Sequence, residues 1–128
     1  MKALYSIALI GALAAGQAYG ACTYPPPPDS LPDGATATRD EMLAGKKKVT
    51  EFDGAINAYT TCLKLETDAA LVKTSDLTDE QKKQNAEIQK MHDQKHNAAV
   101  EADEALAARF NEQLRAYNAK QKEKDGKK

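Results

Sequence analysis

The segment Thr38–Leu63, TRDEMLAGKKKVTEFDGAINAYTTCL, decides the fold of this 128-residue chain. It opens with the pattern of a capping box, in which the Thr38 hydroxyl and the Glu41 carboxylate satisfy free backbone N–H groups at a helix start. Larger or central residues then recur at steps of three and four, the spacing of one face of an α-helix. This stripe consists of Met42, Gly45, Val49, Phe52, Ile56, Tyr59 and Leu63. The pattern predicts a long helix over about residues 39–72.

A second capping-box pattern begins at Thr78 and has Gln81 at its third helical position. The short polar stretch 73–77 before it is typical of a loop. The stripe that follows is weaker, because Lys95 and Gln113 interrupt it. It consists of Ile88, Met91, His92, Ala99, Ala102, Leu106, Phe110, Leu114 and Tyr117. We expect a second helix over about residues 79–120, and a charged flexible tail over 121–128.

Two helices joined by a short loop are expected to pack antiparallel. A turn centred near residue 75 places large residues opposite small ones, which lets the helices approach closely. The facing pairs are Gly45 with Leu106, Val49 with Ala102, Phe52 with Ala99, Tyr59 with His92, and Leu63 with Ile88. The predicted fold class is therefore all-α: an antiparallel, coiled-coil-like two-helix hairpin over residues 38–120.

Residues 21–37 form a proline-rich segment ahead of the hairpin. Its four successive prolines, Pro25–Pro28, favour an extended polyproline II conformation. The sequence Pro32-Asp33-Gly34 is typical of a turn. We therefore expect this segment, called the strap below, to pack back along the hairpin.

The chain has two cysteines, Cys22 and Cys62, and an even count in an exported protein indicates a disulfide. Cys62 lies about 35 Å along a helix that begins near Arg39. The 16 residue steps from Cys22 to Thr38 reach about 50 Å when extended. The strap is thus long enough for a Cys22–Cys62 bond.

The N-terminus predicts export. A positive start at Lys2 precedes an apolar run over 3–15, and Ala18 and Gly20 are small residues at signal-peptidase spacing. The run is too short for a membrane span. We expect a signal peptide over 1–20, cleavage before Ala21, and a periplasmic or secreted product. An uncleaved N-terminal helix is the alternative. A lipid anchor on Cys22 is disfavoured, because Tyr19 stands where a lipobox has an aliphatic residue.

Two short motifs carry a family resemblance: PDGATA at 32–37 and AYTTCL at 58–63. They resemble a group of small, exported proteobacterial proteins that have no established activity. The similarity covers about residues 22–65 and the helical texture beyond. It implies an exported helical protein and adds no chemistry.

His92 and His96 lie four residues apart, on one side of the second predicted helix. This spacing can chelate a divalent transition metal. A third ligand would have to come from elsewhere, and Lys95 between them disfavours a cation. We therefore expect a half-buried His92 beside Tyr59 and a solvated His96, with no cofactor.

Catalytic patterns are absent from the sequence. Beyond the signal peptide the serines are Ser30 and Ser75, both in expected loops, and no glycine-rich phosphate loop exists. The carboxylates are scattered over exposed helix faces, where raised pKa values are not expected. A helical rod also lacks a concave pocket. We expect a protein that is not an enzyme.

The charge pattern indicates no nucleic-acid or lipid partner. The formal net charge is −1, which gives no general attraction to nucleic acid. The run Lys46–Lys48 has acidic neighbours and no interleaved aromatic residues, so it is typical of a solvated helix face.

The predicted function is protein contact in the cell envelope, as an adaptor, a chaperone-like protein or a structural protein. The alternative is a small-ligand or transition-metal binder that uses His92 and His96. The apolar stripes are interrupted at Glu66, Lys95 and Gln113. Such interruptions do not suit a long obligate coiled coil. We therefore favour a monomer over a homodimer.

Overall fold

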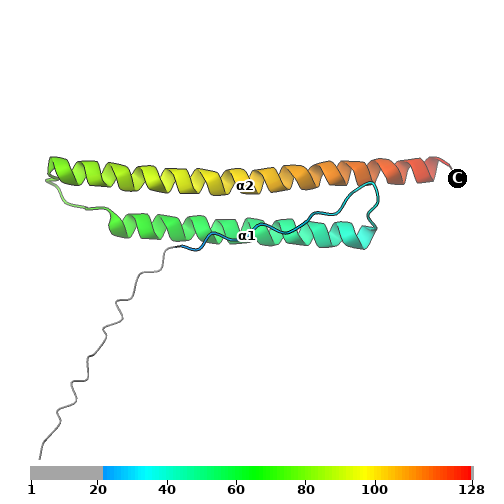
Figure 1. The fold of residues 1–128 in the computed structure, drawn as a ribbon, viewed down its shortest axis with the longest axis horizontal. Helices are drawn as coiled ribbons and strands as arrows, with labels where there is room; N and C mark the ends of the chain where they lie inside the picture. The colour runs from blue at the N-terminus through cyan, green and yellow to red at the C-terminus, as the bar shows by residue number, and fades with distance from the viewer. Residues whose placement is uncertain (1–21, 128) are drawn as a thin grey trace, which may run out of the picture.

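Residues 22–127 are described by a computed structural model. Two helices, α1 (Arg39–Ala70) and α2 (Asp79–Gly126), pack against each other, and the described residues contain no strand. Figure 1 shows α2 beside α1, with the chain reversing in the connection between them. The all-α class and the packing of two helices are confirmed. The predicted signal peptide and its cleavage point before Ala21 lie outside the described residues, as does Lys128.

Both helices begin where the capping boxes predict. The Glu41 N–H donates to Thr38 Oγ1 over 3.3 Å, and the Thr38 N–H donates to Glu41 Oε2 over 2.6 Å. At α2, the Gln81 N–H donates to Thr78 Oγ1 over 3.2 Å, and the Thr78 N–H donates to Gln81 Oε1 over 2.9 Å. The backbone and hydroxyl hydrogen bonds from Thr38 lower the pKa of Glu41. Each box therefore satisfies N–H groups that would otherwise lack an intrahelical partner.

The helix ends differ from the predicted ones. α1 stops at Ala70, because Leu71 has extended backbone angles. The side chain of Asn85 then holds the next residue: its Oδ1 accepts from the Val72 N–H and its Nδ2 donates to the Val72 carbonyl, each over 3.0 Å. α2 continues to Gly126, past the predicted end near Lys120. Lys, Gln and Glu are good helix formers, and α2 contains no proline or glycine before Gly126.

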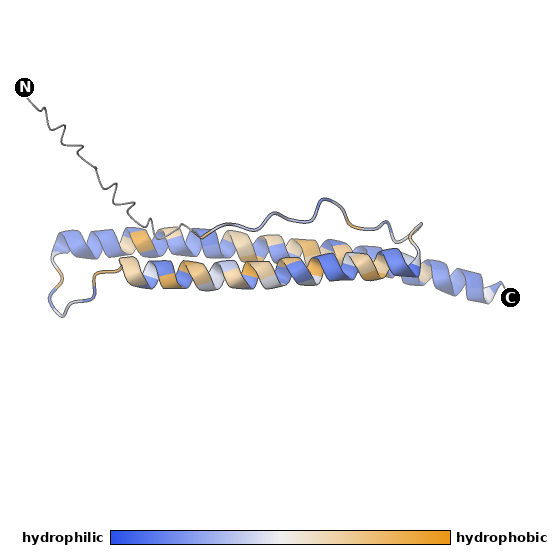
Figure 2. Cartoon of the chain, turned by 90° about the horizontal axis from the view of Figure 1, so that it is seen from below, coloured by the Kyte–Doolittle hydropathy of each residue, from blue (hydrophilic) through white to orange (hydrophobic). Residues whose placement is uncertain are grey.

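The core lies along the seam between the two helices. Its larger cluster contains Phe52, Ile56, Tyr59, Leu63, Ala99 and Leu106, with Val49 and Ala102 packed against it. A smaller cluster of Ala37, Met42 and Phe110 lies nearer the start of α1. Figure 2 shows apolar residues in the middle of the pair, whereas both ends of α2 are hydrophilic. All nine residues predicted to pack the hairpin, including Gly45 and Ile88, are buried or half-buried.

The register differs from the predicted one by about one helical turn. A Cβ placed on Gly45 would lie 2.6 Å from the Pro32 ring and 3.0 Å from the Phe110 ring; these are the nearest atoms, rather than Leu106 as predicted. The cause is the connection over residues 71–78. It is not a symmetric turn, because Asn85 binds Val72 and so α2 begins beyond the end of α1 (Figure 1).

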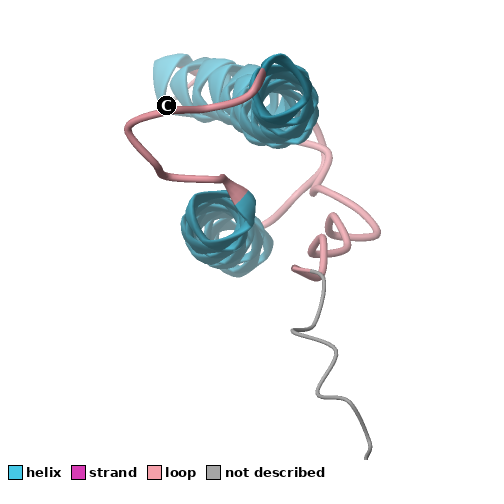
Figure 3. Ribbon diagram, turned by 90° about the vertical axis from the view of Figure 1, so that its left-hand side faces the viewer, coloured by secondary structure: helices cyan, strands magenta, loops and turns pink. Residues whose placement is uncertain are grey.

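The strap runs back beside α1 (Figure 1), and the view along the helices shows it to one side of the pair (Figure 3). Its turn is fixed on α2: the Gly34 N–H donates to Gln113 Oε1 over 2.8 Å. A Cβ on Gly34 would overlap the Gln113 carbonyl and lie 2.9 Å from the Tyr117 nitrogen. Glycine is needed here because the strap backbone approaches the helix backbone directly.

Replacing Gly34 tests this approach. We expect Gly34→Ala to lower the free energy of unfolding by about 1–3 kcal/mol, because the added methyl group overpacks the contact with α2. Gly54→Ala is the control. A Cβ there meets nothing within 4 Å, so this variant should gain about 0.5–1 kcal/mol from its better helix propensity. Urea unfolding followed by circular dichroism measures both. An unchanged midpoint for Gly34→Ala would contradict the position of the turn.

Candidate functional site

The strap is joined to α1 by a disulfide between Cys22 and Cys62, the pair predicted from the sequence. Their Cα atoms are 5.8 Å apart, and Cys22 packs against the larger core cluster. The disulfide is compatible with the oxidising conditions of the periplasm or the cell exterior.

The N-terminal half of the strap sits on α1 through apolar contacts. The Tyr24 and Tyr59 rings form a T-shaped pair, with centroids 5.3 Å apart and planes at 83°. A shallow depression lies between three strap prolines and the α1 residues around Phe52. Within the described chain, the first hydrogen bond from the strap to a helix occurs at Ser30, whose carbonyl accepts from Lys48 Nζ over 3.3 Å. Residues 22–29 are therefore held by packing and by the disulfide.

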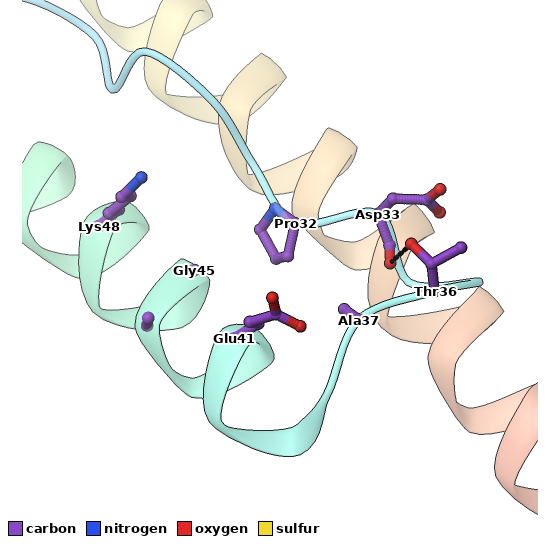
Figure 4. Close-up of a pocket in the computed structure, with 8 residues that line it drawn as sticks. Pro32, Asp33, Thr36, Ala37, Glu41, Gly45 and Lys48 are labelled. Atoms are coloured by element: carbon purple, nitrogen blue, oxygen red, sulfur yellow. Dashed lines mark hydrogen bonds between the residues drawn. The ribbon is translucent and has the colours of Figure 1, made fainter.

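The C-terminal end of the strap forms a depression against the start of α1 (Figure 4). Pro32 lies over Gly45, with Glu41 and Lys48 on either side of the space. The polar atoms of the turn are occupied locally. The Ala35 N–H donates to Asp33 Oδ1 over 2.9 Å, and the Ala37 N–H donates to the Asp33 carbonyl over 2.7 Å. Residues of the strap and of α1 thus line this depression together.

A second part of the seam is not covered by the strap. Beyond Cys62 the two helices form a shallow groove, which we call the distal groove. It is lined by Leu63, Glu66, Thr67, Ala70, Ile88, Met91, His92 and Lys95. Leu63 is buried at its base, whereas Met91 is 53% exposed. The groove combines an apolar floor with a cationic and an anionic side chain.

The two candidate metal ligands lie side by side. The rings of His92 and His96 stack with centroids 5.8 Å apart and planes at 27°, and His92 Nδ1 lies 3.2 Å from Asp93 Oδ1. No group of three or more His, Cys, Asp or Glu side chains in residues 22–127 could hold a metal ion.

The two histidine predictions differ in outcome. His92 is half-buried as predicted, and it lines the distal groove with Leu63. Tyr59 pairs with Tyr24, and a position of His92 beside Tyr59 stays a prediction. The predicted solvated His96 is wrong, because His96 is half-buried.

Sequence reasoning missed a pair of carboxyl groups across the helix seam, Asp53 and Asp103. Asp103 Oδ1 is buried and accepts no hydrogen bond. Burial raises the pKa of Asp103, and the Asp53 side chain and Glu104 raise it further. The expectation that the carboxylates lie only on exposed faces is therefore wrong at Asp103. Its position between Ala99 and Leu106, at the edge of the core stripe, was the available signal.

No helix in the described part of the chain is both long enough and apolar enough to cross a membrane. Comparisons with protein-family models, curated proteins and solved structures found no match.

Reduction tests the energetic role of the disulfide. Cys22 and Cys62 are 40 residues apart in sequence, and in the chain-entropy model closing a loop of that length stabilises the fold by about 4 kcal/mol. We expect reduction to lower the urea midpoint and the melting temperature of the chain without residues 1–20. The control is the double variant Cys22→Ser, Cys62→Ser, which should match the reduced protein and not respond to reductant. Equal midpoints for the oxidised and reduced wild type would refute the stabilising role.

The carboxyl pair predicts a pH dependence. Because the pKa of Asp103 is raised in the folded state, its contribution to stability is fully present below the ordinary carboxyl pKa. That contribution is lost as the pH rises through the raised value. Asp103→Asn removes the charge and supplies an amide donor towards Asp53. We expect it to raise the free energy of unfolding at pH 7 by about 1 kcal/mol, because it removes a partly buried negative charge beside Asp53 and lets an amide N–H group donate to that carboxylate.

Urea unfolding between pH 4 and pH 8 measures this effect. The gain from Asp103→Asn should shrink as the pH falls towards 4, because a growing fraction of the wild-type carboxyl is then protonated. Glu101→Gln, at an exposed position on the same helix, is the control for removing a charge. An equal gain from both variants, or a gain independent of pH, would show that the Asp53–Asp103 pair is not the cause of the gain in the free energy of unfolding.

Proposed function

We propose that this chain is a non-catalytic, exported helical-hairpin protein that acts by contact with a partner protein in the cell envelope. The observation that carries the proposal is the uneven cover of the helix seam. The strap packs over the seam from Cys22 to Ala37, whereas none of residues 22–37 lines the distal groove, which presents an exposed Met91. The groove brings Leu63, Ile88 and Met91 together with polar residues around them, and an apolar surface with a polar rim is typical of an interaction site.

The proposed working form is an antiparallel hairpin with the strap as its third element. Support comes from the Cys22–Cys62 bond at one end of the strap and the Gly34–Gln113 hydrogen bond at the other. The 48 residues of α2 make it about 72 Å long, against about 48 Å for the 32 residues of α1. An elongated body of this kind suits an adaptor, a chaperone-like protein or a structural protein, and we propose that it works as a monomer.

The proposed export rests on the signal-peptide pattern of residues 1–20 and fits the disulfide. The proposal includes no chemical reaction. Asp103, the carboxyl group with a raised pKa, does not line the distal groove.

A second candidate function is transition-metal binding. The stacked rings of His92 and His96 favour it, since both can turn a nitrogen towards one ion. Calorimetric titration with zinc and copper, with His96→Ala as the control, tests it. Absence of saturable heat from the wild type would exclude the metal site.

Crosslinking in place tests the contact function. We expect a photoreactive amino acid at Met91 to give a discrete adduct with another protein in the envelope fraction, because this side chain stands at the groove rim. The matched control is Leu65, which is 67% exposed and does not line the groove. Equal labelling from both positions would contradict the proposal. Retention of the protein in the cytoplasm, with residues 1–20 still attached, would also contradict the proposal.

A further inference from the structure

We propose that the distal groove binds an extended, proline-rich segment of the partner, placed as a continuation of the chain's own strap. This inference rests on the proposed function and names the chemistry of the segment that is bound. The strap shows how this helix pair holds an extended chain.

The strap contacts the helices with a period of three. Cys22, Pro25, Pro28 and Leu31 are half-buried, and the residues between them are exposed. Three residues per turn is the period of polyproline II. A chain in this conformation therefore presents one apolar residue per turn to the helix pair.

The dimensions of strap and helix agree with this arrangement. The ten steps from Cys22 to Pro32 span about 31 Å in polyproline II. On α1, the distance from Cys62, which binds Cys22, to Gly45, which contacts Pro32, is about 26 Å. The strap thus crosses the surface of α1 as an almost fully extended chain that runs opposite to the helix.

The distal groove continues the same surface. Tyr59 and Cys62 contact the strap, and Glu66 and Ala70 follow them at steps of four on the same side of α1. Across the seam, α2 supplies Met91 to the groove. The length from Leu63 to Ala70 is about 10 Å, close to the rise of about 9 Å for one three-residue turn of polyproline II.

The chemistry of the groove favours proline. The α2 side of the groove, from Ile88 to Lys95, lies inside a helix whose backbone groups are already hydrogen-bonded, so it offers few partners to an incoming N–H group. Proline has no N–H group to leave unsatisfied, and its conformation is already restricted before binding. Glu66 and Lys95 have opposite charges, which gives no preference for a charged segment. The flexible thioether of Met91 can adapt to the shape of a proline ring.

Titration with a synthetic decaproline peptide tests the inference. The protein is the oxidised, ¹⁵N-labelled chain without residues 1–20, and its amide signals are followed by NMR. We expect saturable shift changes concentrated at residues 63–70 and 88–95. Because the groove holds little more than one turn of the peptide, binding should be weak. An alternating glycine–serine peptide of equal length should produce no such changes.

Two variants give matched controls. Met91→Glu changes the groove rim at an exposed position, so the fold should be retained. We expect it to weaken decaproline binding at least fivefold. Leu65→Glu makes the same kind of change at an exposed residue outside the groove and should bind like the wild type. Thermal unfolding of both variants verifies that they remain folded.

The results separate this inference from the proposed function. The inference would be overturned if decaproline causes no shift changes in the wild type, or if the changes spread over residues 52–59. It would also be overturned if Met91→Glu leaves the shift changes as they are in the wild type. Self-association that Met91→Glu abolishes would also overturn it, because a second copy would then be the occupant. If residue 91 crosslinks to an envelope protein while decaproline does not bind, the contact function stands and the proline-rich partner is excluded.

Discussion

The structure depends on how little apolar surface two helices can bury against each other. A helix pair covers only the facing side of each stripe, and the side chains at its margins remain in contact with water. The strap supplies a third wall along part of the seam, where Cys22, Leu31 and Pro32 pack against core residues. Residues 22–29 make no hydrogen bond to either helix among those described, so this wall depends on the Cys22–Cys62 bond and on apolar contact.

The beginnings of the helices could be predicted because their signals are local. Each capping box needs only the residue before the helix and one side chain three positions later. The disulfide could be predicted for a different reason. With two cysteines in the chain there is one possible intramolecular pair, and the length of the strap permits it. The nine predicted packing residues follow from helical periodicity, which identifies a face without identifying the opposite residue.

The features that sequence reasoning missed depend on contacts between distant residues. The register shifted by one turn because Asn85 binds the backbone of Val72, and nothing in the local pattern distinguishes Asn85 from a solvated polar residue. The Asp53–Asp103 pair depends on that same register. Both residues lie beside the core stripe in sequence, and which charges meet across the seam is decided by the relative position of the helices.

The uneven cover of the seam has a structural cause that also limits where a partner can bind. The strap begins beside Cys62 because its disulfide is there, and its turn reaches α2 at Gln113 because Gly34 allows close approach. Between these two points the surface is occupied by the chain itself. On the strap side of the helix pair, the described seam is left open beyond Cys62, where Leu63 and Met91 meet. On this side, a partner that contacts the apolar seam without displacing the strap must therefore bind at the distal groove.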